Sequence, residues 1–268
     1  MKNKIRKLMS VLTLIIVVSA CLVGTLWSAP VYAITNGQPD EDGHPYVCIV
    51  VMFDESWQFV TSASGVLISP DIVLTAGHVT EAGCYAFVTF SPEVTYGDLT
   101  GYVFGFPYTH PDYQVGSKPG LPGCLTHDVG IIELSEQVIM TEYGALPNEG
   151  VDDTLAQKTM LDIVGYGYNY RERPSQEWIF YGQRYYAQSE LIASKHRQSD
   201  EFIKITCNPA KGKGGQSFGD SGGPVLLSGT NTVLGLVSYG TNLNSAGVGY
   251  AARIDTADVL EWINSWFP

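Results

Sequence analysis

Short apolar runs separated by turn-forming residues are the feature of this sequence that most restricts its fold. Each run has the length of a β-strand, is rich in Val, Ile and Tyr, and is bounded by Gly, Pro, Asp or Asn. No helical periodicity lies between the runs, which disfavours a parallel sheet with crossover helices. The sequence therefore predicts an all-β fold. The runs are Tyr46–Met52, Ser64–Ser69, Asp71–Thr75, Ala86–Phe90, Val129–Leu134, Met160–Tyr166, Phe202–Cys207, Pro224–Leu227 and Thr232–Tyr239.

The carboxyl-terminal stretch follows a different period. Its apolar side chains recur at i, i+3, i+4 and i+7, which puts them on one face of a helix. Asp255 or Thr256 can cap the start of that helix. We expect a closing helix over about residues 255–267 that packs its tryptophan face onto the body of the protein. The face consists of Val259, Trp262, Ile263 and Trp266.

The amino-terminal segment has the pattern of a secretory signal peptide. Basic residues precede an almost unbroken apolar run, Leu8 to Trp27, and Val31 and Ala33 are small residues at the positions that a signal peptidase reads. We predict that residues 1–33 are removed after Ala33, which implies an extracellular, disulfide-permissive location.

Two alternatives for this segment stay open. The apolar run is longer than a usual signal core, so it could remain as an uncleaved membrane anchor. Val18-Ser19-Ala20-Cys21 also resembles a bacterial lipoprotein box with Cys21 as the lipidated residue, although the residues after Cys21 stay apolar where a lipoprotein turns polar.

The part after residue 33 is strongly acidic. It holds 27 Asp and Glu against 11 Lys and Arg, since four of the 15 basic residues lie in the leader, and its formal charge is −16. Such a surface repels nucleic acid and anionic membranes. We expect a soluble monomer with no nucleic-acid partner and no stable membrane association once the leader is removed. The carboxylates could bind cations, but no loop of the EF-hand type is present.

Three segments carry chemistry in the order His, Asp, Ser. Hydrolysis of an amide needs an activated nucleophile, a base, a group that holds the base, and donors for the oxyanion. His78 follows a predicted strand, Asp128 starts an apolar strand, and Ser221 lies in a glycine-rich bend whose backbone N–H groups can converge on one point. The segments are Leu74-Thr75-Ala76-Gly77-His78-Val79, His127-Asp128-Val129-Gly130-Ile131-Ile132-Glu133-Leu134 and Gly219-Asp220-Ser221-Gly222-Gly223-Pro224.

These segments resemble the three signature motifs of the trypsin/chymotrypsin-type serine peptidases. The likeness covers essentially all of residues 34–268 and is closest to a secreted, bacterial-like member. It implies two six-stranded antiparallel β-barrels, about residues 34–150 and 151–253, with the active site between them. Further matches are Ile34-Thr35-Asn36-Gly37, Ile68-Ser69-Pro70, His110-Pro111-Asp112-Tyr113, Val164-Gly165-Tyr166-Gly167 and Val237-Ser238-Tyr239-Gly240.

The resemblance also assigns roles to individual residues. Ser221 would attack the scissile carbonyl, His78 would take and return the proton, and Asp128 would hold the histidine. The oxyanion hole would be formed by the backbone N–H groups of Gly219 and Ser221. Ser238, Tyr239 and Gly240 would pair with the substrate backbone. In the family, the carboxylate equivalent to Asp220 is buried and forms an ion pair with the α-amino group that chain cleavage creates. Here that group would belong to Ile34. Removal of the leader after Ala33 would therefore create it directly, with no separate activation step.

The cysteines depart from the family pattern. Ser64 and Val79 stand where the family often has a cystine around the histidine, and Ser217 replaces a cysteine beside the specificity pocket. Cys84 follows His78 by six residues and Cys124 precedes Asp128 by four, so both loops converge on the triad and we predict a Cys84–Cys124 disulfide. Four cysteines allow three complete pairings, and Cys207 either stays unpaired or bridges to Cys48.

The specificity pocket departs as well. Trypsin-like enzymes carry an aspartate six residues before the serine, and here that position is Gly215, followed by Gln216. Cleavage after Lys or Arg is therefore not supported. Gly240 would leave the mouth of the pocket open, and we expect an apolar or aromatic residue before the cut.

Other classes fit less well. Gly-Asp-Ser-Gly-Gly satisfies the nucleophile elbow of α/β-hydrolases, but that fold needs a histidine after the serine and none follows Ser221. Subtilisins use the order Asp, His, Ser in a fold with alternating helices. A catalytically silent binding protein on the same fold is the alternative that remains. No metal motif of the H-E-x-x-H type occurs, and we expect neither a metal nor another cofactor, with protein or peptide substrates as the partners.

Overall fold

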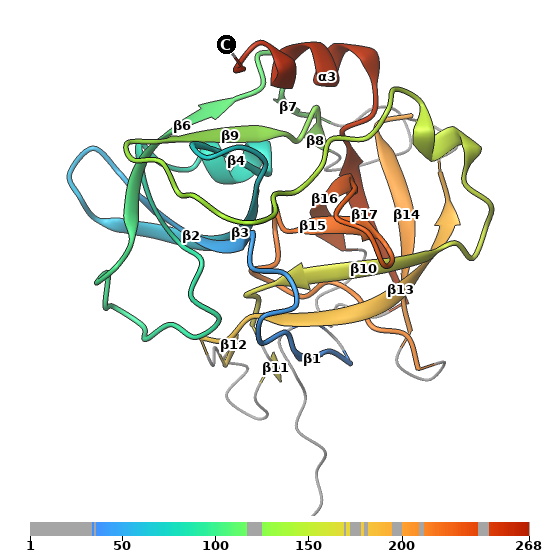
Figure 1. The fold of residues 1–268 in the computed structure, drawn as a ribbon, viewed down its shortest axis with the longest axis horizontal. Coiled ribbons are helices and arrows are strands. Elements are labelled where there is room, and N and C mark those ends of the chain that lie inside the picture. The colour runs from blue at the N-terminus through green and yellow to red at the C-terminus, as the bar shows by residue number, and fades with distance from the viewer. Residues whose placement is uncertain are drawn as a thin grey trace, which may run out of the picture. The chain divides into compact units, whose positions relative to one another are not determined.

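The computed structural model describes residues 34, 36–116, 125–168, 170–171, 178–179, 182–194, 200–208, 212–240 and 247–267. These residues form two closed six-stranded antiparallel β-barrels and a carboxyl-terminal helix, as Figure 1 shows. The predicted fold class is confirmed. No helix in the described ranges is long and apolar enough to cross a membrane.

The first barrel closes through consecutive antiparallel pairs. β2 pairs with both β3 and β5, and β9 pairs with β4 and β6, so the order β2-β3-β4-β9-β6-β5 returns to its start. β4 and β9 are neighbours in this ring; His78 follows β4, and Asp128 lies just before β9. The strands are β2 (Val47–Phe53), β3 (Phe59–Leu67), β4 (Ile72–Thr75), β5 (Tyr85–Thr89), β6 (Val103–Thr109) and β9 (Gly130–Leu134).

The second barrel closes because β13 pairs with both β10 and β14. The ring then runs β13-β10-β15-β16-β17-β14, and β1 (Gln38–Pro39) adds to the edge of β13. The strands are β10 (Met160–Gly165), β13 (Tyr185–Ala193), β14 (Phe202–Cys207), β15 (Pro224–Leu227), β16 (Val233–Gly240) and β17 (Gly247–Arg253). The shorter elements are α2 (Gly77–Thr80), β7 (Gln114–Val115), β8 (Leu125–Thr126), β11 (Tyr170–Arg171), β12 (Trp178–Ile179) and the 3-10 turn η1 (Val151–Thr154).

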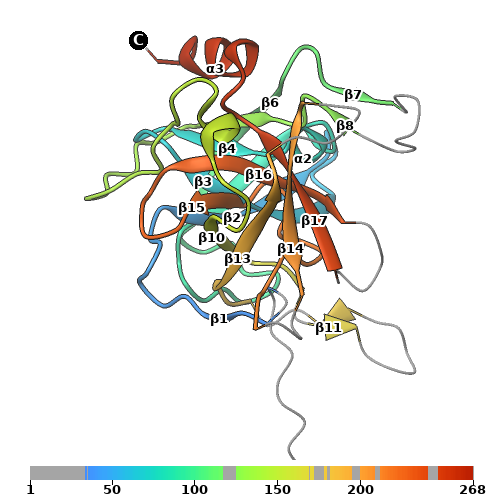
Figure 2. The same ribbon diagram turned by 90° about the vertical axis from the view of Figure 1, so that its right-hand side faces the viewer.

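The predicted closing helix is present as α3 (Ala257–Asn264), with Thr256 at its N-cap position. Its buried face holds Val259 and Ile263. The two half-buried tryptophans contact the end of the first barrel: the rings of Trp266 and Tyr108 lie 4.5 Å apart, and those of Trp262 and His110 4.8 Å apart. The chain thus leaves the second barrel and packs its last helix onto the first, close to β6 in Figure 2.

A buried guanidinium links the two barrels. Arg184, just before β13, is 1% exposed, and its Nε donates to Asp40 Oδ2 at 2.7 Å. Its Nη1 donates to the carbonyls of Val47 and Phe90 in the first barrel, both at 3.1 Å. Burial alone would raise the pKa of Asp40, but hydrogen bonds and charge from His44 and Arg184 outweigh it and hold that pKa below its ordinary value. Arg184 therefore holds the amino-terminal segment, the first barrel and the second barrel together.

We predict that Arg184→Met destabilises the protein by about 3–5 kcal/mol, because it removes the buried guanidinium that pairs with the Asp40 carboxylate. Urea unfolding followed by tryptophan fluorescence measures the change. Lys158→Met is the matched control, since Lys158 is exposed, and its free energy of unfolding should change by less than about 0.5 kcal/mol. Equal stability of the two variants would contradict the linking role of Arg184.

Candidate active site

A fully buried carboxylate, Asp128, is the centre of the site. It is 0% exposed and lies just before β9. Its oxygens accept hydrogen bonds from three donors: His78 Nδ1 at 2.9 and 3.1 Å, the His78 backbone N–H at 2.8 Å and the Ser238 hydroxyl at 2.5 Å. A histidine whose Nδ1 faces a carboxylate keeps its proton on that nitrogen, which leaves Nε2 free to act as a base.

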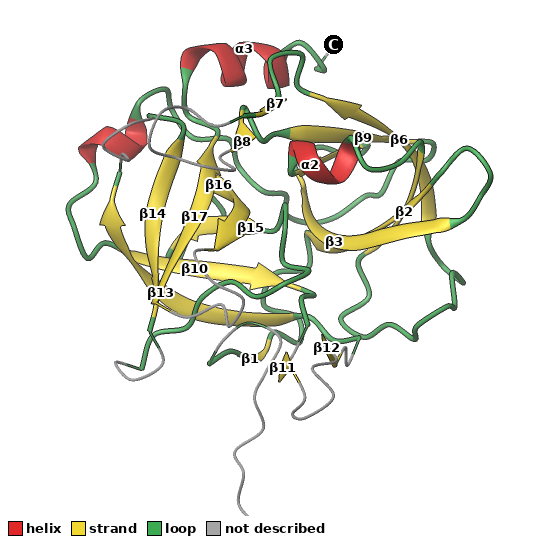
Figure 3. Ribbon diagram, turned by 180° about the vertical axis from the view of Figure 1, so that it is seen from behind, coloured by secondary structure: helices red, strands yellow, loops and turns green. Residues whose placement is uncertain are grey.

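His78 is positioned by the turn that follows β4. The chain bends at Ala76 into α2, and the side chain of His78 remains 28% exposed while its neighbours Gly77 and Val79 are buried. A Cβ on Gly77 would lie 3.0 Å from the Tyr113 ring and 3.1 Å from the Val129 nitrogen. The glycine therefore lets the histidine turn pack directly against the strand that Asp128 precedes (Figure 3).

The turn that carries Ser221 presses against the same part of the first barrel. A Cβ on Gly222, where φ is +76°, would lie 2.0 Å from Thr75 Oγ1 and 2.5 Å from the Ala76 nitrogen. The backbone N–H of Ser64, in β3, donates to the Ser221 carbonyl at 2.9 Å. The second barrel thus brings its serine turn against the residues that lead into His78, and only glycine fits at the point of contact.

Two backbone N–H groups of the serine turn are unused by the fold. The N–H groups of Asp220, Gly222 and Gly223 donate to backbone carbonyls, whereas those of Gly219 and Ser221 donate to no acceptor in the described part of the chain. Gly219 has φ +87°, a conformation that favours glycine. A pair of free N–H groups flanking one peptide unit is the arrangement that binds an oxyanion.

The serine turn contains a buried carboxylate of its own, Asp220. It is 0% exposed and accepts the backbone N–H groups of Gly167 at 2.8 Å and Ser217 at 2.7 Å. Burial raises its pKa to about 7, and the two hydrogen bonds only partly offset that effect. Among the described residues no Lys or Arg side chain forms an ion pair with it, so within this part of the chain an ionised Asp220 has hydrogen bonds but no counter-charge.

Ile34 lies in the core of the second barrel. Its side chain is 0% exposed and belongs to the apolar cluster that includes Ile163 of β10 and Tyr185 of β13. Asp220 is close to the same strand, because a Cβ on Gly165 would lie 2.4 Å from its Oδ1. The two residues that the sequence analysis paired therefore both lie beside β10.

The residues predicted for the specificity pocket lie against β14 and β17 of the second barrel. A Cβ on Gly215 would lie 2.2 Å from the Cys207 sulfur, and a Cβ on Gly249 would lie 2.5 Å from Gln216 Oε1. Gly249 is also the partner of Gly240 across β16 and β17. The buried Gln216 Oε1 has no hydrogen-bond partner among the described residues, so this region keeps an acceptor available.

Strand β16 extends past the serine turn. Its pairing with β15 ends at Leu236, and the next residue, Val237, exchanges backbone hydrogen bonds with Gly222 and Gly223 at 2.7 and 2.8 Å. After a register shift at Ser238, Tyr239 and Gly240 continue beyond this point paired with β17. The segment predicted to receive the substrate backbone thus begins where the serine turn ends.

Three contacts of the site were missed from the sequence. The Ser238 side chain holds Asp128, a role that the predicted substrate pairing did not include. Ser64, at a position where the family often has cysteine, accepts the Tyr166 backbone N–H at 2.9 Å and donates to the Gly219 carbonyl at 3.3 Å. His127, with φ +48°, meets Asp258 of α3 at 2.8 Å through Nε2. Of the three, only the role of His127 had a signal in the sequence, namely its position next to Asp128.

The cysteines give a partial outcome. Cys48 and Cys207 are free, buried thiols in different barrels, so the bridge left open between them does not form. Burial raises the pKa of Cys207 to about 12, which makes it an inert thiol at neutral pH. Cys84 is an exposed free thiol, and Cys124 lies outside the described residues, so the Cys84–Cys124 disulfide stays a prediction. The signal peptide, residues 1–33, and Cys21 also lie outside them.

No group of three or more metal-ligating side chains gathers within the described ranges. The chemistry of the site consists instead of one buried carboxylate on one histidine, with a hydroxyl on the facing turn.

Comparisons with known proteins agree with this geometry. A model of the Trypsin family matches residues 34–263. The cercarial protease of Schistosoma mansoni is 26% identical over 259 residues, which cover 87% of this chain and 90% of that protein. HL collagenase shares the fold with a TM-score of 0.66 at 19% identity, over 86% of this chain and 96% of its own.

The Vibrio cholerae VesB protease has a TM-score of 0.62 at 18% identity, over 86% of this chain and 67% of its own. At such identities the solved structures speak for the fold alone. A bacterial origin stays a prediction. Since the family model covers most of the residues, the chain belongs to the trypsin family of serine peptidases.

Proposed function

We propose that this chain is a secreted serine endopeptidase that hydrolyses peptide bonds through an acyl-enzyme, with His78, Asp128 and Ser221 as its triad. The observation that carries the proposal is the buried Asp128 carboxylate on His78 Nδ1, next to a serine turn that packs against the strand leading into His78. Membership of the family supports the reaction class.

The chemistry follows from these positions. His78 Nε2 takes the Ser221 proton as the hydroxyl attacks the scissile carbonyl, and Asp128 stabilises the imidazolium that forms. The free N–H groups of Gly219 and Ser221 would bind the oxyanion. The imidazolium then protonates the leaving amine, and a water deprotonated by His78 hydrolyses the acyl-enzyme. Ser238, by donating to Asp128, keeps that carboxylate oriented.

Ser221→Ala and His78→Ala should each lower kcat by about a millionfold, and the double variant should be little slower, because the triad acts as a unit. Hydrolysis of a mixed peptide pool measures the loss, and a serine-directed covalent probe should label Ser221 only in the folded wild type. The matched control is Ser228→Ala, since Ser228 bonds to Asp162 away from the site, and it should keep full activity. Normal turnover by the triad variants would instead favour the silent binding protein.

The α-amino group of Ile34 would be the missing partner of Asp220. Burial holds the pKa of Asp220 at about 7 in the uncleaved chain, so its ionisation costs free energy near neutral pH. An ammonium group brought to it by cleavage after Ala33 would stabilise the carboxylate and fix the serine turn. The ion pair raises the pKa of the α-amino group above its ordinary value of about 8. The stabilisation that the protonated amine gives to the serine turn is therefore complete below about pH 8 and is lost as the pH rises through the raised pKa.

A form that begins at Ile34 should be at least about 100-fold more active than one that keeps part of the leader. Its activity should fall at alkaline pH as the amine deprotonates. Asp220→Asn should lower the activity of the Ile34 form to that of the extended form. The control is Asp42→Asn, which neutralises an exposed carboxylate near the amino terminus and should leave activity unchanged. An active secreted form whose amino terminus lies well before Ile34 would contradict the pairing.

The residue before the cut is proposed to be apolar or aromatic. Gly215 touches Cys207 so closely that no side chain, and hence no carboxylate, fits there without displacing β14. Cleavage of a peptide library should show kcat/KM at least about tenfold higher for Phe, Tyr or Leu than for Lys or Arg, a factor worth about 1.4 kcal/mol.

Gly215→Asp should not introduce cleavage after Lys or Arg and should destabilise the barrel by overpacking, by about 1–3 kcal/mol. Gly116→Asp is the control, because a Cβ there meets no atom within 4 Å. Efficient cleavage after basic residues by Gly215→Asp would show that β14 yields easily.

A further inference from the structure

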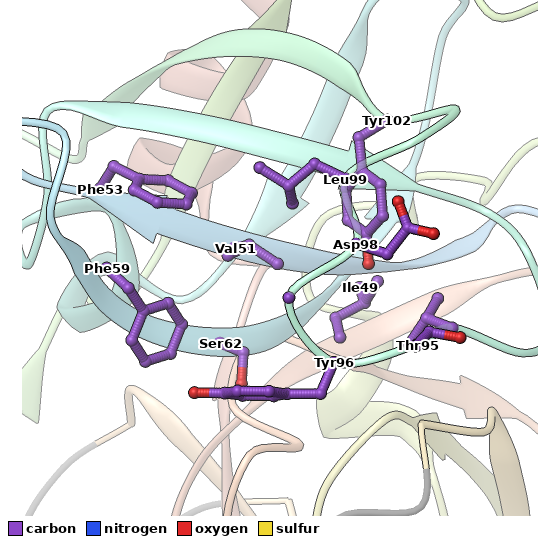
Figure 4. A pocket seen from close by; sticks show the side chains of 12 residues that line it. Ile49, Val51, Phe53, Phe59, Ser62, Thr95, Tyr96, Asp98, Leu99 and Tyr102 are labelled. Carbon is purple, nitrogen blue, oxygen red and sulfur yellow. The ribbon is translucent and has the colours of Figure 1, made fainter.

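The outer wall of the first barrel contains an apolar pocket that the proposed reaction does not use. It lies between strands β2 and β3 and the 94–102 loop, and its volume is about 290 Å³. Figure 4 shows Val51 and Leu99 at its centre, with Phe53 and Phe59 on one side and Tyr102 on the other. Ile49 and Val51, at its floor, are 2% and 9% exposed, so the strand presents an apolar surface outward as well as into the core.

The mouth of the pocket is formed by two exposed aromatic rings. Tyr96 is 78% exposed and Phe59 is 48% exposed, and their ring centres lie 6.4 Å apart, edge to face. They come from opposite sides, the loop and β3. Exposed aromatic residues around an apolar hollow mark binding sites more often than isolated surface hydrophobics do. A void of this size holds one bulky side chain and is small for a whole cofactor.

The charged side chains in the pocket lining and in the adjacent β2–β3 turn are acidic. The sequence has no Lys or Arg from residue 8 to residue 117, whereas residues 34–157 carry 17 Asp and Glu and only one Lys. The other half, residues 158–268, holds ten basic and ten acidic residues. The excess negative charge therefore lies on the half of the protein that contains the pocket. Asp98 lines it, and Asp54 and Glu55 lie in the turn between β2 and β3.

Strand β3 connects the pocket to the candidate active site. Ser62 lines the pocket, and two residues further along β3 the N–H of Ser64 donates to the Ser221 carbonyl. Two residues of a strand span about 7 Å. A polypeptide bound at Ser221 can therefore reach the pocket with a few extended residues, while the cleaved bond and the pocket remain separate.

We propose that this pocket is a docking site for a segment of the polypeptide substrate, outside the residues that are cut, that carries a bulky apolar side chain flanked by Lys or Arg. The apolar side chain fills the space above Val51 and Leu99. The neighbouring cations face Asp98 and the rings of Phe59 and Tyr96, which attract cations through their faces. The inference rests on the proposed peptidase function for the occupant's identity, but the binding itself needs no catalysis.

Photo-crosslinking locates the occupant directly. The probe is a ten-residue Gly/Ser peptide with a central Lys-X-Lys, where X is benzoyl-phenylalanine, added to the full secreted chain carrying Ser221→Ala. We expect crosslinks within residues 49–62 and 94–102. Tyr96→Ser and Phe59→Ser should each reduce the yield at least tenfold, whereas Ile139→Ser, which truncates another exposed apolar residue, should not. Crosslinks only around Cys207 and Gly215 would overturn the proposal.

Charge is tested by fluorescence polarisation with Lys-Phe-Lys, Lys-Ser-Lys and Glu-Phe-Glu versions of the peptide. The first should bind at least tenfold more tightly than the other two, and its affinity should fall as salt rises. Asp98→Asn keeps the hydrogen bond acceptor for the Thr100 N–H but removes the charge, and should weaken binding several-fold. Glu136→Gln, an exposed residue elsewhere on the first barrel, should not. Equal binding of the Glu-Phe-Glu peptide would contradict the charge argument.

Kinetics connect the pocket to the reaction. Substrates with the same cleaved sequence carry Lys-Phe-Lys or Lys-Ser-Lys either before or after it, separated by a short linker. One placement should raise kcat/KM at least tenfold for Lys-Phe-Lys, and Tyr96→Ser should abolish that ratio. No effect in either placement would overturn the docking role even if the short substrate is cleaved normally. If the short substrate is not cleaved at all, the peptidase function fails, while crosslinking still reports the pocket.

Discussion

The buried charge of Asp128 is the interaction on which the candidate site depends. An ion removed from water is costly unless hydrogen bonds replace the lost hydration, and here donors come from both barrels. His78 supplies two of them from the first barrel and Ser238 supplies one from the second. Ser238 reaches Asp128 only when the barrels are docked, so the full set of donors to the carboxylate is complete only in the assembled fold. Arg184 makes the equivalent connection elsewhere, with a buried cation in place of a buried anion.

The contact between the barrels leaves almost no tolerance at the serine turn. Gly222 touches Thr75 and Ala76, and Gly165 and Gly167 touch the Asp220 carboxylate, each at distances that exclude a Cβ. These glycines are required by close approach, and Gly222 also by its positive φ. The conformation of the serine turn is thus determined by contacts with the neighbouring segments. Asp220 is the part of it that remains electrostatically incomplete, since its carboxylate has hydrogen bonds but no cation in the described part of the chain.

Sequence reasoning reached the fold because strand length and turn residues are local properties, and it reached the candidate triad because three motifs occur in one order. The strands it missed break those local rules. β6 contains Gly105 and Pro107, and β13 has polar residues at 188–190, yet pairing on both sides forms them. The Ser238–Asp128 bond and the pocket beside Ser62 were out of reach for another reason: each joins segments far apart in the chain, and neither has a motif of its own.

The uneven distribution of lysine and arginine has a consequence for how the protein resists other peptidases. Peptidases that cut after basic residues are common in secreted mixtures, and they find no site between residues 8 and 117. The strands around His78 therefore offer these enzymes no cleavage site even when they are transiently unfolded. Lys118 is followed by Pro119, and such enzymes cut Lys-Pro bonds poorly, so damage by them is confined to Lys158 and the half that follows it. For the same reason a tryptic digest returns β2 through β9 as one very long fragment, and limited proteolysis of this protein will report on the second barrel almost alone.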